Sequence, residues 1–592
     1  MQSLSVLTIA SQVGTRSRTA EQVATEALAR ATAYDAFQPQ AWICRVPDSQ
    51  VLANARRIDA RIAAGEALPL AGVPFAVKDN IDVAGLPTTA ACPEYAYVPG
   101  ASAPVVERLL AAGAVLLGKT NLDQFATGLV GTRSPHGAPA CVFNREYVSG
   151  GSSSGSAVVV AAGVVAFALG TDTAGSGRVP AAFNNLFGFK PTRGRWSTRG
   201  VVPACRSLDC VTTFTNNAAD AALLDEVIVS FDSADPYSRR ETRRSAPLGA
   251  SFRFGVPRPE NLNFMGDEEA PALFRSARDR LVLCGGVPVE VDVTPLLRAA
   301  QLLYTGPWVA ERTAALEDFL NTHPTAIHPV VRAIVQSGKG IGAVEAFRGQ
   351  YALQGYLRDA EQLWSGIDVL LLPTTPTIYR VSEVLAEPVA LNSNLGLYTN
   401  FVNLLDMSAI AVPAGFRRNA TGFGVSFIGP AWADGCLVQL AQRYEAAAPM
   451  PAAPDLCRVV RPKTLQLAVV GAHLAGMPLH WQLTSRAARL ARSTRTAPVY
   501  RLFAMKGTTP PKPALVHSGA DAGGGAIELE IYELDAAAFG SFVAEVPAPL
   551  AIGKVLLEDG STVNGFVAEP RALEGAEDIT AQGGWRAHMS KR

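Results

Sequence analysis

Residues 150–178 read GGSSSGSAVVVAAGVVAFALGTDTAGSGR. The apolar middle of this stretch predicts a buried helix followed by a buried strand, too short and too rich in Ala and Gly to span a membrane. The same alternation recurs in residues 104–119, where an amphipathic helix, a stop at Gly113 and a buried strand are expected, and residues 367–372 form another strand-like run. Helices that alternate with buried strands favour an α/β sandwich.

The two Gly-rich ends of this stretch are the candidate site. The glycines in residues 170–177 let successive backbone N–H groups turn toward one point, as an oxyanion hole requires. Ser176 lies inside this loop, but a serine hydroxyl needs a base to become a nucleophile. No histidine is an obvious base, because His136 has no acidic partner in its RSPHGAP segment. Lys78 follows the apolar run FAV in GVPFAVKDNIDVAG (72–85), so burial would keep its amine neutral.

Each segment alone is weak, since a Gly/Ser run is more often a turn and a lysine more often a solvated charge. Together and in this order, the three segments resemble the amidase-signature family. The resemblance implies an α/β/α sandwich with a mixed central sheet, with Ser176 as nucleophile, Ser152 as relay after a cis peptide bond, and Lys78 as base. It also implies an oxyanion hole made by the N–H groups of Thr173, Ala174, Gly175 and Ser176, and a backbone carbonyl, assigned to Gly128, against the substrate amide.

One position departs from the family pattern. Two glycines usually precede the nucleophile, whereas this chain has Ala174 and Gly175. A single methyl group fits there if Ala174 needs no positive φ.

A change in composition predicts two domains. Residues 446–454, AAAPMPAAP, have the Ala/Pro content of a semi-rigid linker. We therefore expect an amidase domain over residues 1–445, a linker over 446–463 and a small α+β, barrel-like domain over 464–592. In the last domain we expect an opening strand at LQLAVVGAHL, a helix over 485–493, and strands at AIELEIYEL and FGSFVAEV.

The substrate is suggested by Tyr304 and Arg312 in YTGPWVAERTAAL and by the C-terminal domain. Eight residues on one helix would place both side chains on roughly one side, where they could hold a small carboxylate. Without further context, a surface arginine and a packed tyrosine is the more common situation. Together with VVGAHLAGMPLHWQL and GWRAHMSKR, however, the pair resembles allophanate hydrolases. That resemblance implies that His473 assists a decarboxylation, although a lone histidine at a strand end is as often structural.

The composition favours a small-molecule partner over nucleic acid or a membrane surface. Lysine plus arginine and aspartate plus glutamate are equal at 52 each, so no net field favours nucleic acid or an anionic membrane, and a small-molecule substrate is expected. Eight scattered cysteines form no CxxC pair, which argues against a disulfide framework and a zinc site. We expect no cofactor and no metal, a cytoplasmic location, a homodimer, and association with other nitrogen-metabolism enzymes.

Three alternatives stay open. The chain could be the amidase subunit of a tRNA-dependent amidotransferase, which would need partner subunits. It could be a general amidase for small amides. In either case the C-terminal domain could be a scaffold that docks neighbouring enzymes without chemistry of its own.

Overall fold

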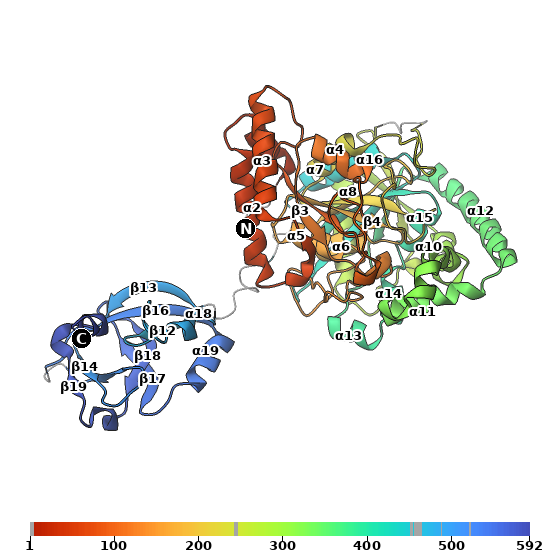
Figure 1. Cartoon of the computed structure of the whole chain (residues 1–592). Coiled ribbons are helices and arrows are strands. Elements are labelled where there is room, and N and C mark those ends of the chain that lie inside the picture. The colour runs from red at the N-terminus through yellow and green to blue at the C-terminus, as the bar shows by residue number, and fades with distance from the viewer. Residues whose placement is uncertain are drawn as a thin grey trace. The chain divides into compact units, whose positions relative to one another are not determined.

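The computed structural model describes residues 5–241, 247–449, 454, 464–486, 488–519 and 523–591. The chain divides into two compact units, Met1–Val459 and Val460–Arg592 (Figure 1). Most of the expected linker, residues 446–463, lies outside the described residues, so its boundaries stay a prediction.

The first unit is built on an 11-stranded mixed sheet, in the order β1-β3-β2-β4-β6-β5-β10-β11-β9-β7-β8. Its strands are β1 (Trp42–Arg45), β2 (Pro74–Lys78), β3 (Val115–Thr120), β4 (Phe167–Asp172), β5 (Phe187–Lys190), β6 (Cys210–Thr215), β7 (Phe252–Pro257), β8 (Gly286–Val291), β9 (Val369–Pro373), β10 (Ser408–Phe416) and β11 (Gly422–Gly429). Its helices are α1 (Val6–Gly14), α2 (Ala20–Asp35), α3 (Asp48–Ala63), α4 (Pro104–Ala111), α5 (Ser154–Ala161), α6 (Val179–Phe183), α7 (Ala218–Ile228), α8 (Ala270–Leu283), α9 (Thr294–Thr305), α10 (Trp308–Thr322), α11 (Pro329–Ser337), α12 (Ala343–Gly366), α13 (Val381–Ala386), α14 (Ala390–Leu395), α15 (Asn400–Leu404) and α16 (Asp434–Ala446).

Both faces of the sheet are covered, as the α/β/α expectation requires. Along β9, Leu371 packs into one hydrophobic core, whereas Leu370 and Leu372 pack into another. Successive side chains of a strand point to opposite faces, so the two cores lie on opposite sides of the sheet. The expected helix and strand pairs at residues 104–119 and 157–169 are confirmed as α4 with β3 and α5 with β4.

The parallel strands β2 and β4 pair directly, with Phe75 opposite Phe167 and Val77 opposite Leu169. Because parallel strands end at the same edge, Lys78 at the end of β2 lies beside the loop that follows β4. Helix α5, whose described residues are almost all buried, packs against both strands and presents its N-terminal end near the same edge.

The second unit has a five-stranded sheet (β13-β16-β12-β18-β17) and a three-stranded sheet (β15-β14-β19). Its elements are β12 (Thr464–Val469), α18 (Trp481–Thr484), β13 (Arg489–Arg495), β14 (Tyr500–Ala504), β15 (Pro513–His517), β16 (Glu528–Asp535), α19 (Ala536–Ala544), β17 (Leu550–Leu556), β18 (Thr562–Ala568), β19 (Glu577–Asp578) and α20 (Trp585–Met589). The α+β expectation is confirmed.

Two element predictions in this unit are wrong. The expected helix over 485–493 is largely strand β13, which pairs antiparallel with β16. The expected strand FGSFVAEV is largely helix α19. In both cases the local pattern was overridden by pairing and packing within the unit.

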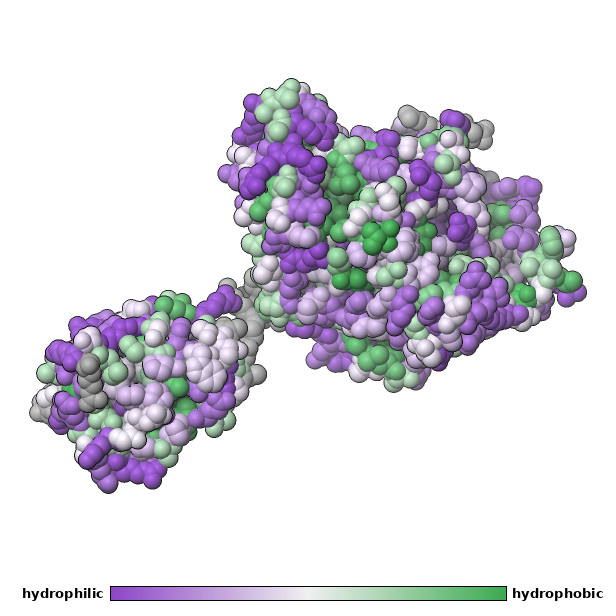
Figure 2. Space-filling view, viewed as in Figure 1, coloured by the Kyte–Doolittle hydropathy of each residue, from purple (hydrophilic) through white to green (hydrophobic). Residues whose placement is uncertain are grey.

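On the face shown in Figure 2, hydrophilic residues predominate and apolar residues are scattered among them. Among the described residues, none of the helices combines the length and the apolar character needed to cross a bilayer.

Candidate functional site

Lys78 occupies a fully buried position at the end of β2. Its Nζ lies 2.7 Å from Ser152 Oγ and 2.7 Å from Thr171 Oγ1. Burial lowers the pKa of Lys78 to about 7, against the opposing effect of the carboxylates of Asp123, Asp209 and Asp172. A large fraction of this amine is therefore uncharged at neutral pH and able to accept a proton.

Ser152 lies just before α5, and the Gly151–Ser152 peptide bond is cis, as the family resemblance implied. The side chain is buried, and its hydroxyl is hydrogen-bonded to the Lys78 amine. Two of the three expected triad residues are thus in direct contact. Thr171, the other partner of Lys78, was not predicted from the sequence, although it lies in the quoted stretch.

Ser176 lies in the loop between β4 and α6 and is 3% exposed. The carboxylate of Asp172 holds this loop by accepting hydrogen bonds from the N–H groups of Gly175 (2.8 Å) and Gly177 (3.0 Å). Arg178 anchors Asp172 through two hydrogen bonds of 2.9 Å. Although burial raises the pKa of Asp172, the Arg178 guanidinium, the charge of Lys190 and the Gly177 N–H together lower it below its usual value.

The hydrogen bonds within this loop change which N–H groups can form the expected oxyanion hole. The Gly175 N–H donates to Asp172, so it is not available to a substrate oxygen in this structure. Within the described part of the chain, the N–H groups of Thr173, Ala174 and Ser176 donate to no other group. Ala174 is absent from the residues with positive φ, so the methyl group in place of the usual glycine is accommodated.

Tyr304 and Arg312 come together, but not on one helix as expected. Tyr304 lies near the end of α9 and Arg312 lies on α10. The helical conformation is interrupted between them at Gly306 and Pro307. Proline cannot donate the backbone hydrogen bond that a continuing helix needs. The Arg312 guanidinium nevertheless lies 5.3 Å from the centre of the Tyr304 ring.

Gly128 lies in a buried loop that runs from Asp123 to Arg133. The Asp123 carboxylate accepts hydrogen bonds from the N–H groups of Val130, Gly131 and Arg133, at 2.9 to 3.2 Å. A Cβ atom at Gly128 would lie 2.5 Å from Asp123 Oδ2, so only glycine fits. The role predicted for its carbonyl stays a prediction. Asp123 itself carried no sequence motif that marked it.

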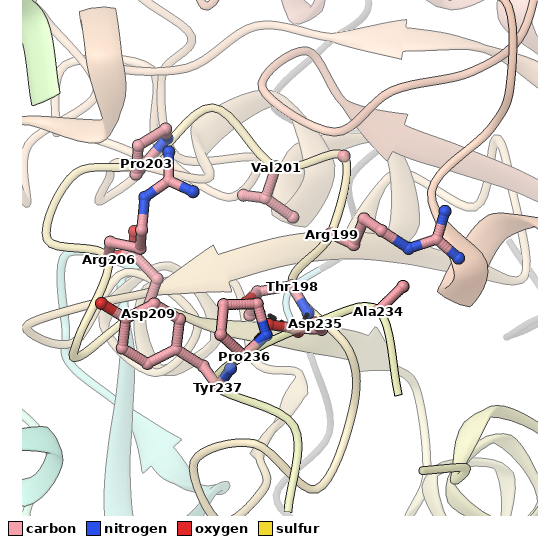
Figure 3. Close-up of a pocket in the computed structure, with 11 residues that line it drawn as sticks. Thr198, Arg199, Val201, Pro203, Arg206, Asp209, Ala234, Asp235, Pro236 and Tyr237 are labelled. Atoms are coloured by element: carbon pink, nitrogen blue, oxygen red, sulfur yellow. Dashed lines mark hydrogen bonds between the residues drawn. The ribbon is translucent and has the colours of Figure 1, made fainter. Parts of the chain in front are cut away.

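Asp209 connects the Ser176 loop to a cavity of about 170 Å³ (Figure 3). Its carboxylate accepts a hydrogen bond from the Thr173 hydroxyl and from the N–H groups of Ala204 and Cys205. Burial raises the pKa of Asp209 to about 6, with the hydrogen bonds opposing that rise. Figure 3 shows Arg199 and Arg206 on opposite sides of the cavity that Asp209 lines.

In the second unit, His473 is held in an aromatic environment. Its Nε2 lies 2.7 Å from Gln482 Oε1, and its ring stacks on Phe566 with centroids 5.1 Å apart, while Phe542 meets it edge-on. Burial lowers the pKa of His473, which favours the neutral imidazole. Among the described residues of both units, no group of three or more His, Cys, Asp or Glu side chains is arranged to hold a metal ion.

The fold and this site define an amidase. The family model named Amidase matches residues 23–438, more than half of the chain, and the chain belongs to this family. A second model, the allophanate hydrolase C-terminal domain, matches residues 465–590.

Individual proteins of known sequence or structure are similar to this chain over most of its length. The chain is 45% identical over 572 residues to the urea amidolyase of Saccharomyces cerevisiae, covering 93% of this chain and 31% of that protein. It therefore spans about a third of the length of this curated relative. The solved allophanate hydrolase of Kluyveromyces lactis superposes with a TM-score of 0.70 at 42% identity, over 97% of each chain. A glutamyl-tRNA(Gln) amidotransferase subunit from Symbiobacterium thermophilum is 36% identical, over 68% of this chain and 88% of that one.

Proposed function

We propose that this chain hydrolyses allophanate, urea carrying a carboxylate on one nitrogen, and releases ammonia and carbon dioxide. The observation that carries the proposal is the pairing of buried Arg312 with half-buried Tyr304, in the same unit as the Lys78 and Ser152 pair. A primary amide and a carboxylate are the two ends of allophanate, and the proposed site offers a group for each. The likeness of both units to the Kluyveromyces lactis allophanate hydrolase supports this choice.

In the proposed reaction, neutral Lys78 takes a proton from Ser152, which takes one from Ser176 as its oxygen attacks the amide carbon. The N–H groups of Thr173, Ala174 and Ser176 stabilise the developing oxyanion. The proton returns through the same relay to the leaving nitrogen, and ammonia departs from an acyl-enzyme. Water then attacks the acyl group, regenerates Ser176 and releases a dicarboxylated amine, which loses carbon dioxide.

Arg312 and Tyr304 are proposed to hold the substrate carboxylate. A guanidinium offers two parallel N–H donors to a carboxylate and stays charged at any pH of interest. Arg312 is 2% exposed, and its Nε has no hydrogen-bond partner within the described residues. A buried donor without a partner is costly, so an incoming anion would stabilise this site.

The second unit is proposed to assist the loss of carbon dioxide through His473. Its half-buried imidazole, lying against Phe566 and Phe542, offers an apolar surrounding that favours loss of charge from a carboxylate. The alternative for this unit is a scaffold without chemistry.

A homodimer, a cytoplasmic location and docking to other nitrogen-metabolism enzymes are further proposals. The seven described cysteines are free thiols, which fits a reducing compartment.

The test is ammonia release from a panel of small ureido acids and amides, with wild type and Ser176→Ala. We expect allophanate to be the preferred substrate and Ser176→Ala to lose on the order of 10⁴-fold or more in kcat. Lys78→Ala and Ser152→Ala should be similarly inactive. A preference for glutamine or for neutral amides would favour the amidotransferase-subunit or general-amidase alternative, and more than about one per cent residual turnover in Ser176→Ala would remove it as nucleophile.

A further inference from the structure

A second buried guanidinium lies beside Arg312 and is joined to it through a single residue. Arg133 Nη1 donates to the Thr127 carbonyl at 2.9 Å, and Arg312 Nη1 donates to the Thr127 hydroxyl at 3.2 Å. All three side chains are buried, with exposed fractions of 1% for Arg133, 1% for Thr127 and 2% for Arg312. Thr127 is therefore the common anchor of two cations.

In the part of the chain that the structure describes, neither cation has a carboxylate partner. Arg133 Nη2 donates to the Pro388 carbonyl at 2.6 Å, and the Nε atoms of both Arg133 and Arg312 have no partner within the described residues. The contrast is Arg178, equally buried, which forms an ion pair with Asp172.

The carboxylates that act electrostatically on these two cations are already occupied by other donors. Asp123 accepts three backbone N–H groups of its own loop. Asp209 accepts the Thr173 hydroxyl and two backbone N–H groups. Glu311 accepts the N–H and hydroxyl of Ser207, each at 2.7 Å.

Two buried positive charges without an ion pair repel each other and carry an unmet cost of desolvation. An anion held by Arg312 would gain from the field of both charges. Arg133 lies in the loop that also contains Gly128, and Arg312 lies on α10, so the two guanidinium groups come from separate elements.

We propose that Thr127 and Arg133 are specificity-determining residues of this site: Thr127 positions the Arg312 guanidinium, and Arg133 supplies a second buried charge that selects an anionic over a neutral substrate. The inference rests on the proposed function and adds two residues to it. Arg133 acts through the field and through Thr127, so it is a positioning residue rather than a catalytic one.

The test compares allophanate with biuret, which has the same skeleton but a terminal amide in place of the carboxylate. Wild type, Thr127→Val and Arg133→Gln are assayed for kcat and KM with allophanate and for inhibition by biuret. Allophanate binding is also measured by calorimetry in a Ser176→Ala background, because KM equals a dissociation constant only when chemistry is slow. Thr127→Val keeps the side-chain shape, and Arg133→Gln keeps donors for the two carbonyls but removes the charge.

We expect each variant to weaken allophanate binding about tenfold or more, as for loss of a charge-assisted contact, with kcat and biuret inhibition changed less than about threefold. Thr127→Ser and Arg133→Lys should restore most of the affinity, because they retain the hydroxyl and the charge. Thr213→Val is the matched control, since the Thr213 hydroxyl is buried without a partner among the described residues and lies outside the site.

The outcomes separate the two proposals. If wild type does not release ammonia from allophanate, the proposed function fails. If wild type does so and Thr127→Val and Arg133→Gln weaken allophanate and biuret equally, or neither, this inference is overturned while the proposed function stands. If Arg133→Gln does not fold, as shown by circular dichroism, the isosteric Thr127→Val decides the inference alone.

Discussion

At the scale of single residues, the ionisation of Lys78 governs the pH dependence of the proposed reaction. The pKa of Lys78 is lowered to about 7, and only the neutral amine can accept the proton of Ser152. Activity is thus present above this pKa and lost as the pH falls through it. We expect kcat/KM for allophanate to drop about tenfold per pH unit below about 7, measured as initial rates of ammonia release.

A substitution of Asp209 should shift the acid limb of this pH–rate profile, which is the range where activity falls with decreasing pH. Its carboxylate stabilises protonated Lys78 and so raises the lysine pKa, against the larger effect of burial. Asp209→Asn keeps the shape and removes the charge, so the acid limb should shift to lower pH. A limb that stays where it is would show that Lys78 is not the titrating base. Because Asp209 also holds Thr173, kcat at the plateau is recorded alongside the shift.

A single substitution also tests the proposed contact of Arg312 with the substrate carboxylate. Arg312→Ala should raise KM for allophanate on the order of 100-fold, because the loss of a buried charge partner leaves the substrate carboxylate desolvated and unpaired. A short neutral amide should be affected far less. Equal losses on the two substrates, with a lowered melting temperature, would mean that Arg312 only supports α10.

At the scale of elements, the loop between β4 and α6 is held by a few exacting backbone positions. Gly175 has φ +133°, and a Cβ atom there would lie 2.5 Å from Thr399 Oγ1. Gly175→Ala should lower the free energy of unfolding by about 1–3 kcal/mol and reduce kcat strongly, because the Ser176 backbone must shift. Ala174→Gly is the control: Ala174 does not need positive φ, so urea unfolding and turnover should change little.

Elements also show where local pattern is a poor guide. A helix is expected over residues 485–493, yet most of these residues lie in strand β13, whose side chains are mostly exposed. The pairing partner β16, about forty residues later in the chain, decides this conformation. A strand is expected over residues 539–546, but most of them form helix α19, from which Phe542 is buried in the core of the second unit.

At the scale of the whole molecule, each unit has its own hydrophobic core, which supports the proposal that the two can be separated. A protein ending near Pro451 should fold and release the first ammonia normally, but leave the carboxylated intermediate to decay on its own timescale. Time-resolved product analysis of full-length and truncated enzyme measures this directly. Adding the separate second unit should restore prompt carbon dioxide release.

His473→Ala in the full-length chain should behave like the truncated enzyme if the second unit is catalytic. Gln482→Ala, which removes the hydrogen bond to His473 without touching the amidase site, should give a partial defect of the same kind. Identical product courses in all of these proteins would instead favour a scaffold and remove His473 from the proposed site.

The sequence by itself indicated the α/β fold, the second unit, and Ser176 and Lys78 as candidates, because buried strands, Gly-rich loops and an Ala/Pro-rich stretch are local signals. The role of Ser152 came from the family resemblance. Only the tertiary structure brought Tyr304 to Arg312 across the break at Pro307, directed the Gly175 N–H to Asp172, and gathered Asp123, Asp209 and Arg133 around the site. Contacts such as that of Thr127 with Arg312 join residues far apart in the chain, whereas that of Gly175 with Asp172 is local but depends on a loop conformation that the sequence pattern does not specify. The burial that lowers the pKa of Lys78 arises only when strands and helices pack together.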